Sequence, residues 1–428
     1  MKKSLKITLV SALALFLLAG CAAAPASSAE SLSQSASSGE AVLLSSATAS
    51  SRTTTVTAAS TDIDATVSKR DASGEYDASE AVTLSPDGDL TITEAGTYLL
   101  SGEYKGMIVV EVGEEDKVQL VLDNATISND SGPAIYVRSA DKVFLTAAEG
   151  TVNTISDSSS YSFTDEETTP DAAVFSKDDL TINGTGKLTI TGNYKHAVVS
   201  KDDLVVTAKN LTVSAANTGL NGKESVALSD ASVVINAGNN GIRSDEIVSI
   251  SGNSVEVDAS EGIEATYILI SGGDITVNAS DDGINVARKS TTYTPTVEIT
   301  GGNVTVTMGA GDTDGIDSNG DIIITGGTIS VNAASAFDYD GSATFTGGTV
   351  YVNGQQVTTL PNQMMGGGMG GFHGQGGFGG RPEGQEGFGG ETNGDGMFGH
   401  GPRGQGGFGG DRGGQRDFGA QPGSSEQA

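Results

Sequence analysis

The chain of 428 residues contains one cysteine, three histidines and no tryptophan. A single cysteine excludes an internal disulfide, and so few thiol and imidazole groups disfavour a zinc or copper site. Bases are also scarce, because 23 Lys and Arg stand against 54 Asp and Glu and the net charge is −31. A chain this acidic does not attract nucleic acid or an anionic lipid surface through its own field. It is suited instead to cations, or to polyanions that cations bridge.

The N-terminus has the pattern of a lipoprotein signal peptide over residues 1–20. Three lysines precede an apolar run, residues 7–18, that is too short to remain as a membrane-spanning helix. The run closes with Leu18-Ala19-Gly20-Cys21, in which small residues precede the cysteine. We therefore predict cleavage before Cys21 and lipidation of Cys21. The mature protein is then expected outside the cytoplasm, at the cell surface, anchored to the cell membrane by lipid alone.

Composition divides the remaining chain into three parts. Residues 21–80 are rich in Ser, Ala and Thr without apolar periodicity, which predicts a disordered tether. Residues 361–428 are rich in Gly with regularly spaced Phe, which predicts a disordered tail. The body between them, residues 81–360, carries 39 acids and 13 bases and has a charge of −26. The acidity therefore belongs to the part that folds.

A Gly-Ile or Gly-Leu step recurs in the body. Its glycines are Gly219, Gly241, Gly262, Gly283 and Gly315, at intervals of 22, 21, 21 and 32 residues, the last including an insertion at 288–295. Each period contains short alternating runs such as "ILISGGDITVNAS" and "IIITGGTISVNAA", joined by turns too short for a helix. Periods of this length indicate a solenoid, whereas a β-sandwich or propeller would need longer antiparallel hairpins. We predict an all-β fold, a right-handed parallel β-helix with coils of about 21–22 residues.

Stacked coils lie ~4.8 Å apart, so equivalent residues form rows along a solenoid. The position before each glycine and the position two after it become acidic in the later coils, and no Lys or Arg occurs between Lys289 and Arg381 to compensate. Clustered carboxylate and amide oxygens suit Ca²⁺, a hard cation that takes several oxygen ligands; a solvated acidic face is the alternative. The residues of these two rows and the acids beside them are therefore candidate calcium ligands. They are Glu261, Glu264, Asp281, Asp282, Asn285, Asp312, Asp314, Asp317, Asp338 and Asp340.

Four stretches of the body resemble a known family. They are residues 98–112 ("YLLSGEYKGMIVVEV"), residues 172–204, residues 281–285 ("DDGIN") and residues 313–327 ("TDGIDSNGDIIITGG"). These stretches resemble the carbohydrate-binding β-helix lipoproteins of clostridia and their relatives, which are similar to family-nine pectate lyases. The resemblance implies bound calcium and the binding, without cleavage, of a plant cell-wall polysaccharide such as polygalacturonate (pectin) or cellulose. It places one calcium site at Asp281, Asp282 and Asn285, with Glu261 or Asp258 from the preceding coil, and a second copy at Asp314 and Asp317.

We therefore expect a surface-anchored, calcium-binding protein that binds polysaccharide and has no catalytic residues. Tyr267, Tyr293 and Tyr339 are near the acidic coils in the sequence and are candidates to stack on a sugar ring. The alternative of a calcium-dependent lyase needs a positioned base, and the nearby Arg288 and Lys289 belong to the insertion, where loop solubility is the simpler role. A third possibility is an adhesin or structural wall protein in which calcium only stiffens the solenoid.

Overall fold

The computed structural model describes residues 66–84, 88–165, 168–311 and 313–362. Cys21, Asp312 and the Gly-rich segment after residue 362 lie outside the described residues, so what the sequence predicts for them stays a prediction. In the described part, no helix has the length and apolar character needed to cross a membrane.

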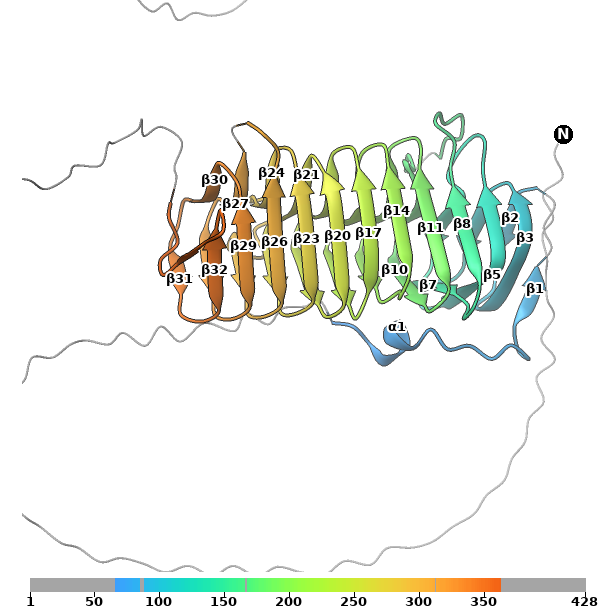
Figure 1. Cartoon of the computed structure of the whole chain (residues 1–428). Coiled ribbons are helices and arrows are strands. Elements are labelled where there is room, and N and C mark those ends of the chain that lie inside the picture. Colours follow the sequence, from blue (N-terminus) through green and yellow to red (C-terminus); the bar gives the residue numbers. More distant parts are fainter. Residues whose placement is uncertain (1–65, 85–87, 166–167, 312, 363–428) are drawn as a thin grey trace, which may run out of the picture. The chain divides into compact units, whose positions relative to one another are not determined.

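Short parallel strands stack into a solenoid, which confirms the predicted parallel β-helix (Figure 1). Each complete turn supplies one strand to each of three ladders. The first ladder is a sheet of 11 strands, so the solenoid has about 11 turns. The second and third ladders are joined into one sheet of 22 strands, because two long strands near the N-terminal end pass through both.

The strand bounds show how regularly the coils repeat. The first ladder contains β2 (Leu90–Ile92), β4 (Ile108–Glu111), β6 (Ile135–Ser139), β9 (Ala172–Ser176), β12 (His196–Ser200), β15 (Leu220–Gly222), β18 (Asn240–Ser244), β21 (Glu261–Ala265), β24 (Asp282–Val286), β27 (Asp314–Ser318) and β30 (Ser335–Tyr339). The second contains β1 (Val82–Leu84), β7 (Lys142–Ala147), β10 (Asp179–Gly184), β13 (Asp203–Val206), β16 (Ser225–Ser229), β19 (Ile247–Ser251), β22 (Tyr267–Ile270), β25 (Thr296–Ile299), β28 (Asp321–Ile324) and β31 (Ala343–Phe345). The third contains β8 (Val152–Ser156), β11 (Lys187–Gly192), β14 (Leu211–Ala215), β17 (Ser232–Ala237), β20 (Ser254–Ala259), β23 (Asp274–Ala279), β26 (Asn303–Met308), β29 (Thr328–Asn332) and β32 (Thr349–Val352). The long strands are β3 (Gly96–Lys105) and β5 (Lys117–Ser128).

Aliphatic side chains fill the interior of the solenoid in columns. In the first ladder, Ile242, Ile263, Ile284, Ile316 and Phe337 pair in register on consecutive coils, and each is fully buried. Alternation along each strand places every second side chain inside and its neighbours outside. The rows of inward and outward residues therefore follow directly from the register.

The recurring glycine is a packing requirement. A Cβ on Gly283 would lie 2.3 Å from Val306 Cγ1 and 2.5 Å from the carbonyl oxygen of Gly315 on the next coil. The same contacts, with a valine methyl and with the next glycine's carbonyl, meet a Cβ on Gly241 or Gly262. Only glycine lets the backbone of the first ladder pack this closely against the third.

Both ends of the described solenoid carry elements that differ from the repeat. At the C-terminal end, β33 (Gln355–Val357) pairs antiparallel with β32 across an Asn353-Gly354 turn in which both residues have positive φ. Near the N-terminal end, helix α1 (Lys69–Ser73) lies against the second ladder (Figure 1).

The docking of α1 differs from the prediction that all of residues 21–80 form a tether. Asp71 is buried, pairs with Lys142 Nζ at 3.1 Å and accepts a hydrogen bond from Thr181 Oγ1. Asn183 Nδ2 and Thr207 Oγ1 donate to the carbonyl oxygen of Asp71 at 3.1 and 2.6 Å. The folded body thus begins before residue 81, because α1 finds its partners 71 to 136 positions away, where local composition gives no sign of them.

Candidate functional site

Outward side chains of the first ladder form one row whose chemistry changes along the solenoid. At the N-terminal end, Tyr136, Phe175 and Val199 are buried and pack against Phe163 of the segment that leads into β9. The row then continues in register through Asn221, Arg243, Glu264, Asn285, Asp317 and Asp338. These pairings confirm the stacking that the spacing of the glycines predicts. This polar part of the row passes from an amide through a base to carboxylates, with the amide of Asn285 between Glu264 and Asp317.

A second acidic row runs beside the first, at the start of the same strands. Asn240 pairs with Glu261, and Asp282 pairs with Asp314, which pairs in turn with Ser335. The two rows meet on β24, β27 and β30 in a group that we call the acidic corner. It consists of Asp281, Asp282, Asn285, Asp314, Asp317 and Asp338.

Burial and the charges of neighbouring acids raise the pKa of three carboxyl groups in the acidic corner, those of Asp282, Asp317 and Asp338. Burial, followed by the charges of Asp282, Asp314, Asp338 and Asp340, raises the pKa of Asp317 to about 7. For Asp282, burial and then the charges of Asp281 and Asp314 raise the pKa to about 6. Two unit charges ~5 Å apart repel by roughly 1 kcal/mol in water and by several times more beside a low-dielectric wall. The corner therefore favours protons or cations.

Several oxygens at the corner also lack partners. Asn285 Nδ2 donates to Asp282 Oδ2 at 3.1 Å, which leaves Asn285 Oδ1 buried with no hydrogen bond in the described structure. Thr313 Oγ1, Asp314 Oδ1 and Ser335 Oγ are likewise buried without a partner there. A buried polar atom left unsatisfied costs ~1–3 kcal/mol. These oxygens come from consecutive coils and are of the type that hard cations bind.

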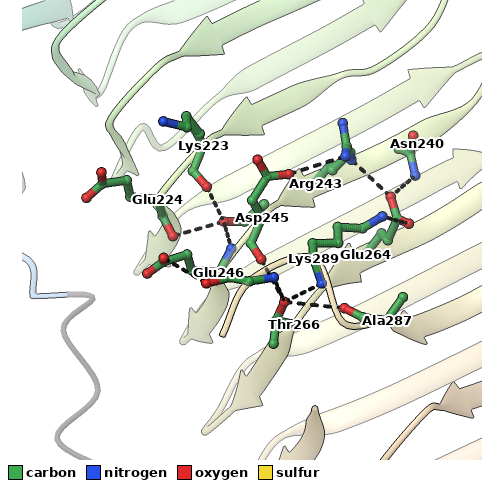
Figure 2. A network of polar contacts seen from close by, with 12 residues as sticks. Lys223, Glu224, Asn240, Arg243, Asp245, Glu246, Glu264, Thr266, Ala287 and Lys289 are labelled. Carbon is green, nitrogen blue, oxygen red and sulfur yellow. Dashed lines mark hydrogen bonds and ion pairs between the residues drawn. The ribbon is translucent and has the colours of Figure 1, made fainter. Parts of the chain in front are cut away.

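Glu264 differs from the other nominated ligands, because bases neutralise it. The residue is 8% exposed, and its side chain accepts hydrogen bonds from Asn240 Nδ2 at 2.9 Å and Arg243 Nε at 3.1 Å. Its second oxygen forms an ion pair with Lys289 Nζ. Figure 2 shows the Arg243 and Lys289 side chains converging on this carboxylate. Two cations already compensate its charge, which disfavours Glu264 as a calcium ligand, and its nomination stays a prediction.

Lys289 also departs from expectation, because the insertion that carries it is ordered. The backbone N–H groups of Lys289 and Ser290 both donate to Thr266 Oγ1 at 3.0 Å. The Lys289 side chain is 20% exposed and reaches back to Glu264 on β21. The residue is thus a structural cation that links the insertion to the first ladder, and not merely a solubilising loop residue.

Of the three tyrosines nominated as sugar platforms, two are buried and the third packs against the main core. Tyr267 and Tyr293 are 5% and 8% exposed, and their rings lie 5.7 Å apart in a cluster with Ile247 beneath the insertion. Tyr339 packs against the main core and donates from its hydroxyl to the Leu360 carbonyl at 3.5 Å. Stacking on a sugar needs an open ring face, which burial denies to Tyr267 and Tyr293. Their nomination as sugar platforms is therefore wrong.

Three other nominated acids, Asp258, Asp340 and Glu261, lie outside the acidic corner. Asp258 is exposed on the outer face of the third ladder, in register with Asn278. Asp340 is exposed on the turn after β30, where its charge contributes to the raised pKa of Asp317. Glu261, at the edge of the corner, accepts a hydrogen bond from Asn240 Nδ2 at 3.1 Å, and burial followed by the charge of Glu264 raises its pKa.

One acidic group escaped the sequence analysis. Among the described residues, Asp179, Asp202 and Asp203 bring one oxygen each to within 4.8 Å of one another. Lys142 Nζ is 3.5 Å from Asp179, and Ser225 Oγ donates to Asp203 at 2.7 Å, so partners already engage two of these acids. The repeated "KDD" of adjacent coils (201–203 and 177–179) was the signal that could have revealed the group.

Comparison with known proteins decides the class to which this architecture belongs. Residues 86–357 match the sequence profile of a family described as carbohydrate-binding domain-containing proteins. The chain belongs to this family. The carbohydrate-binding domain thus coincides with the solenoid and includes both the acidic corner and the insertion.

Two individual proteins are similar to parts of the carbohydrate-binding domain. A carbohydrate-binding domain-containing protein of Acetivibrio thermocellus is 38% identical over 129 residues, which are 30% of this chain and 45% of that protein. The aligned segment therefore spans less than half of the relative. A solved structure, the gadolinium derivative of the polysaccharide lyase-like protein from C. thermocellum, is 29% identical and covers 63% of this chain and 87% of its own. Its TM-score is 0.39, too low for residue-by-residue comparison.

Proposed function

We propose that this protein is a surface-anchored, non-catalytic receptor for an acidic plant cell-wall polysaccharide, and that Ca²⁺ held at the acidic corner bridges the protein to the polymer. Family membership supports carbohydrate binding as the general role. The predicted lipidation of Cys21 would supply the anchor, placing the solenoid outside the cytoplasm. Polygalacturonate is the polymer that best fits a metal-bridged mode of binding.

The observation that carries the proposal is the set of buried, unpartnered oxygens at the corner, on Asn285, Thr313, Asp314 and Ser335. They fit the coordination chemistry of calcium, which accepts carboxylate, amide and hydroxyl oxygens in irregular geometry. No Cys or His occurs between His196 and His373, which disfavours softer metals. Asp282, Asp314 and Asp317 would supply the negative charge, and calcium when bound would neutralise their repulsion.

The negative charge of the body is the reason we expect glycan binding to depend on a metal ion. The body carries −26, so a polyuronate chain is repelled unless a cation lies between carboxylate and carboxylate. A divalent ion with open coordination positions bridges the two and inverts the local electrostatics. Glycan binding should therefore require calcium and weaken as salt screens the ion.

Binding without cleavage is supported by the state of Lys289. A lyase of this type needs an unencumbered base beside the metal. The Lys289 ammonium is instead paired with Glu264, and Arg288 is an exposed residue of the insertion. The roles of both residues fit recognition better than proton abstraction.

The test is affinity electrophoresis of the purified protein through gels that contain polygalacturonate, with calcium or with a chelator. We expect retardation in calcium that disappears with chelator and is reduced in Asp317→Asn. The exposed third-ladder acid Glu256 provides the matched control, Glu256→Gln, which should migrate as the parent does. Equal mobility with and without polymer in calcium would reject the proposal. Unsaturated sugar product in the same mixture would show cleavage and replace the receptor by a lyase.

A further inference from the structure

The bases of the C-terminal part of the solenoid gather in one place. Residues 210–362 contain eighteen acids and four bases, and the bases are Lys223, Arg243, Arg288 and Lys289. Three of them line a single surface hollow, and Arg243 lies at its edge, where it pairs with Asp245 at 3.3 Å. In a region this acidic, such a gathering indicates a recognition surface for an anion.

The hollow, which we call the basic hollow, has a volume of about 550 Å³. One wall is formed by the turns that follow β15 and β18, with Lys223 and Glu224 on one coil and Asp245 and Glu246 on the next. The first part of the insertion, from Arg288 to Thr291, forms the other wall. Figure 2 shows the turn residues and Lys289 around this region, with the Lys223 side chain directed away from the network.

The walls of the basic hollow are held in place before any ligand arrives. Ser290 Oγ and Thr292 Oγ1 donate to Glu246 Oε1 at 2.9 and 2.7 Å, which ties the insertion to the turn after β18. Tyr293 of the insertion packs on Tyr267 of β22. A preformed site lowers the entropy lost on binding.

Three bases and three acids line the basic hollow, and partners engage most of them. Asp245 is paired with Arg243 and Lys289 with Glu264, two hydroxyls donate to Glu246, and the exposed Glu224 has no ion pair among the described residues. Lys223 and Arg288 are exposed, and within the described residues neither side chain has an ion pair or a hydrogen bond. Lysine and arginine bind carboxylates through charge-assisted hydrogen bonds.

We propose that the basic hollow is a second glycan contact, in which Lys223 and Arg288 bind a carboxylate of an acidic sugar directly. This inference rests on the proposed function, because it takes the same acidic polysaccharide as its ligand. It differs in mechanism, since the contact involves two protein cations and no metal. The polymer would then be held by calcium at the acidic corner and by side chains at the hollow, both of which lie along the first ladder.

The test compares Lys223→Gln/Arg288→Gln with the parent in the full chain, using polygalacturonate and its fully methyl-esterified form in calcium. We expect the double variant to bind polygalacturonate about tenfold more weakly, as for loss of one charge-assisted contact. The affinity of the double variant for Ca²⁺ alone, measured by calorimetry, should equal that of the parent. The esterified polymer, which lacks the carboxylates, should bind the parent and the variant equally weakly.

A charge-matched control separates local recognition from the overall field. Lys105→Gln/Lys187→Gln removes two exposed bases from the third ladder and should leave the affinity unchanged. The inference is overturned if the hollow variant binds polygalacturonate as tightly as the parent, or if the control loses as much affinity. Parent binding that survives chelator but is lost in the hollow variant would instead overturn only the calcium bridge. Absence of parent binding in every condition would reject both.

Discussion

Asp282 and Asp314 occupy the same position on consecutive coils of the first ladder, directly paired in register. Neither has a base beside it on the following coils, because the chain has no Lys or Arg from residue 290 to residue 380. Two carboxylates stacked at ~4.8 Å are a cost to the folded state unless a proton or a cation is present. The pH dependence of stability should therefore report on Asp282 and on Asp317 beside it, and the metal dependence on the acidic corner.

Stability without metal should decline as the pH rises from about 4 to about 7. The pKa of Asp282 is about 6 and that of Asp317 about 7 in the folded chain, compared with ~3.9 in an unfolded chain. Between these values the folded state retains protons that the unfolded state has lost, so raising the pH favours unfolding. If calcium binds the folded corner as we propose, it should restore stability at pH 7. Thermal unfolding across this pH range, in chelator and in calcium, measures both effects.

Asp317→Asn isolates the contribution of the corner from the general acidity of the body. In chelator the variant should be more stable than the parent at pH 7 and should show a flatter pH profile, while its gain from calcium should be smaller. Glu256→Gln, which removes an equal charge from an exposed strand position, should retain the parent profile. Parallel profiles for Asp317→Asn and the parent would show that the corner does not titrate as we describe.

Glu264→Gln should destabilise the fold, although it relieves an acidic protein of one charge. The substitution leaves Arg243 and Lys289 facing each other without the carboxylate that both contact. Loss of charge-assisted hydrogen bonds at this largely buried site should cost about 1–3 kcal/mol. Urea unfolding in calcium at pH 7 measures the change. A variant as stable as the parent would mean that the ion pairs contribute nothing and that Glu264 remains free for a metal.

Gly283→Ala should disturb the stacking of the first ladder. The new methyl group would overlap Val306 and the Gly315 carbonyl, so the coil must shift against the third ladder. Overpacking of this kind costs ~1–3 kcal/mol. Gly88→Ala is not a suitable control, because the φ of Gly88 is +93° and a side chain there would strain the backbone. The control is Ala287→Gly, which changes a neighbouring position without adding atoms. Urea unfolding that gives equal stability for Gly283→Ala and the parent would contradict the packing account of the Gly-Ile repeat.

Asp71→Ala should release α1 from the solenoid without unfolding the coils. Burial alone would raise the pKa of Asp71, but hydrogen bonds from Ser68 and Thr181, with the charge of Lys142, hold it below the usual value. Removing the carboxylate deletes these contacts, so amides of residues 69–73 should exchange with solvent about tenfold faster or more, as for a loss of at least ~1.4 kcal/mol. Hydrogen exchange with mass spectrometry measures this. Asp77→Ala, at an exposed position, should leave the exchange of α1 unchanged.

The period of the Gly-Ile step was sufficient to predict both the fold and the rows of acids. In a parallel β-helix each period is one coil, so a spacing of 21 or 22 residues along the chain becomes direct stacking in space. Asn285 and Asp317 are separated by 32 residues, yet they pair in register, because the insertion leaves the ladder and returns to it. Local alternation likewise determined which residues face inward.

Other features depended on contacts that the period does not encode. Glu264 and Asp317 occupy the same row, but Arg243 and Lys289 reach only Glu264. Tyr267 is buried because the insertion places Tyr293 against it, and α1 docks because Asp71 meets Lys142 and Thr181. The sequence by itself thus determined the solenoid, its register and its acidic rows, since these follow from a repeat in which every coil is placed by its neighbours. The tertiary structure alone decided which acids are compensated and which aromatic rings are buried, since side-chain direction and contacts between distant segments lie outside any repeat.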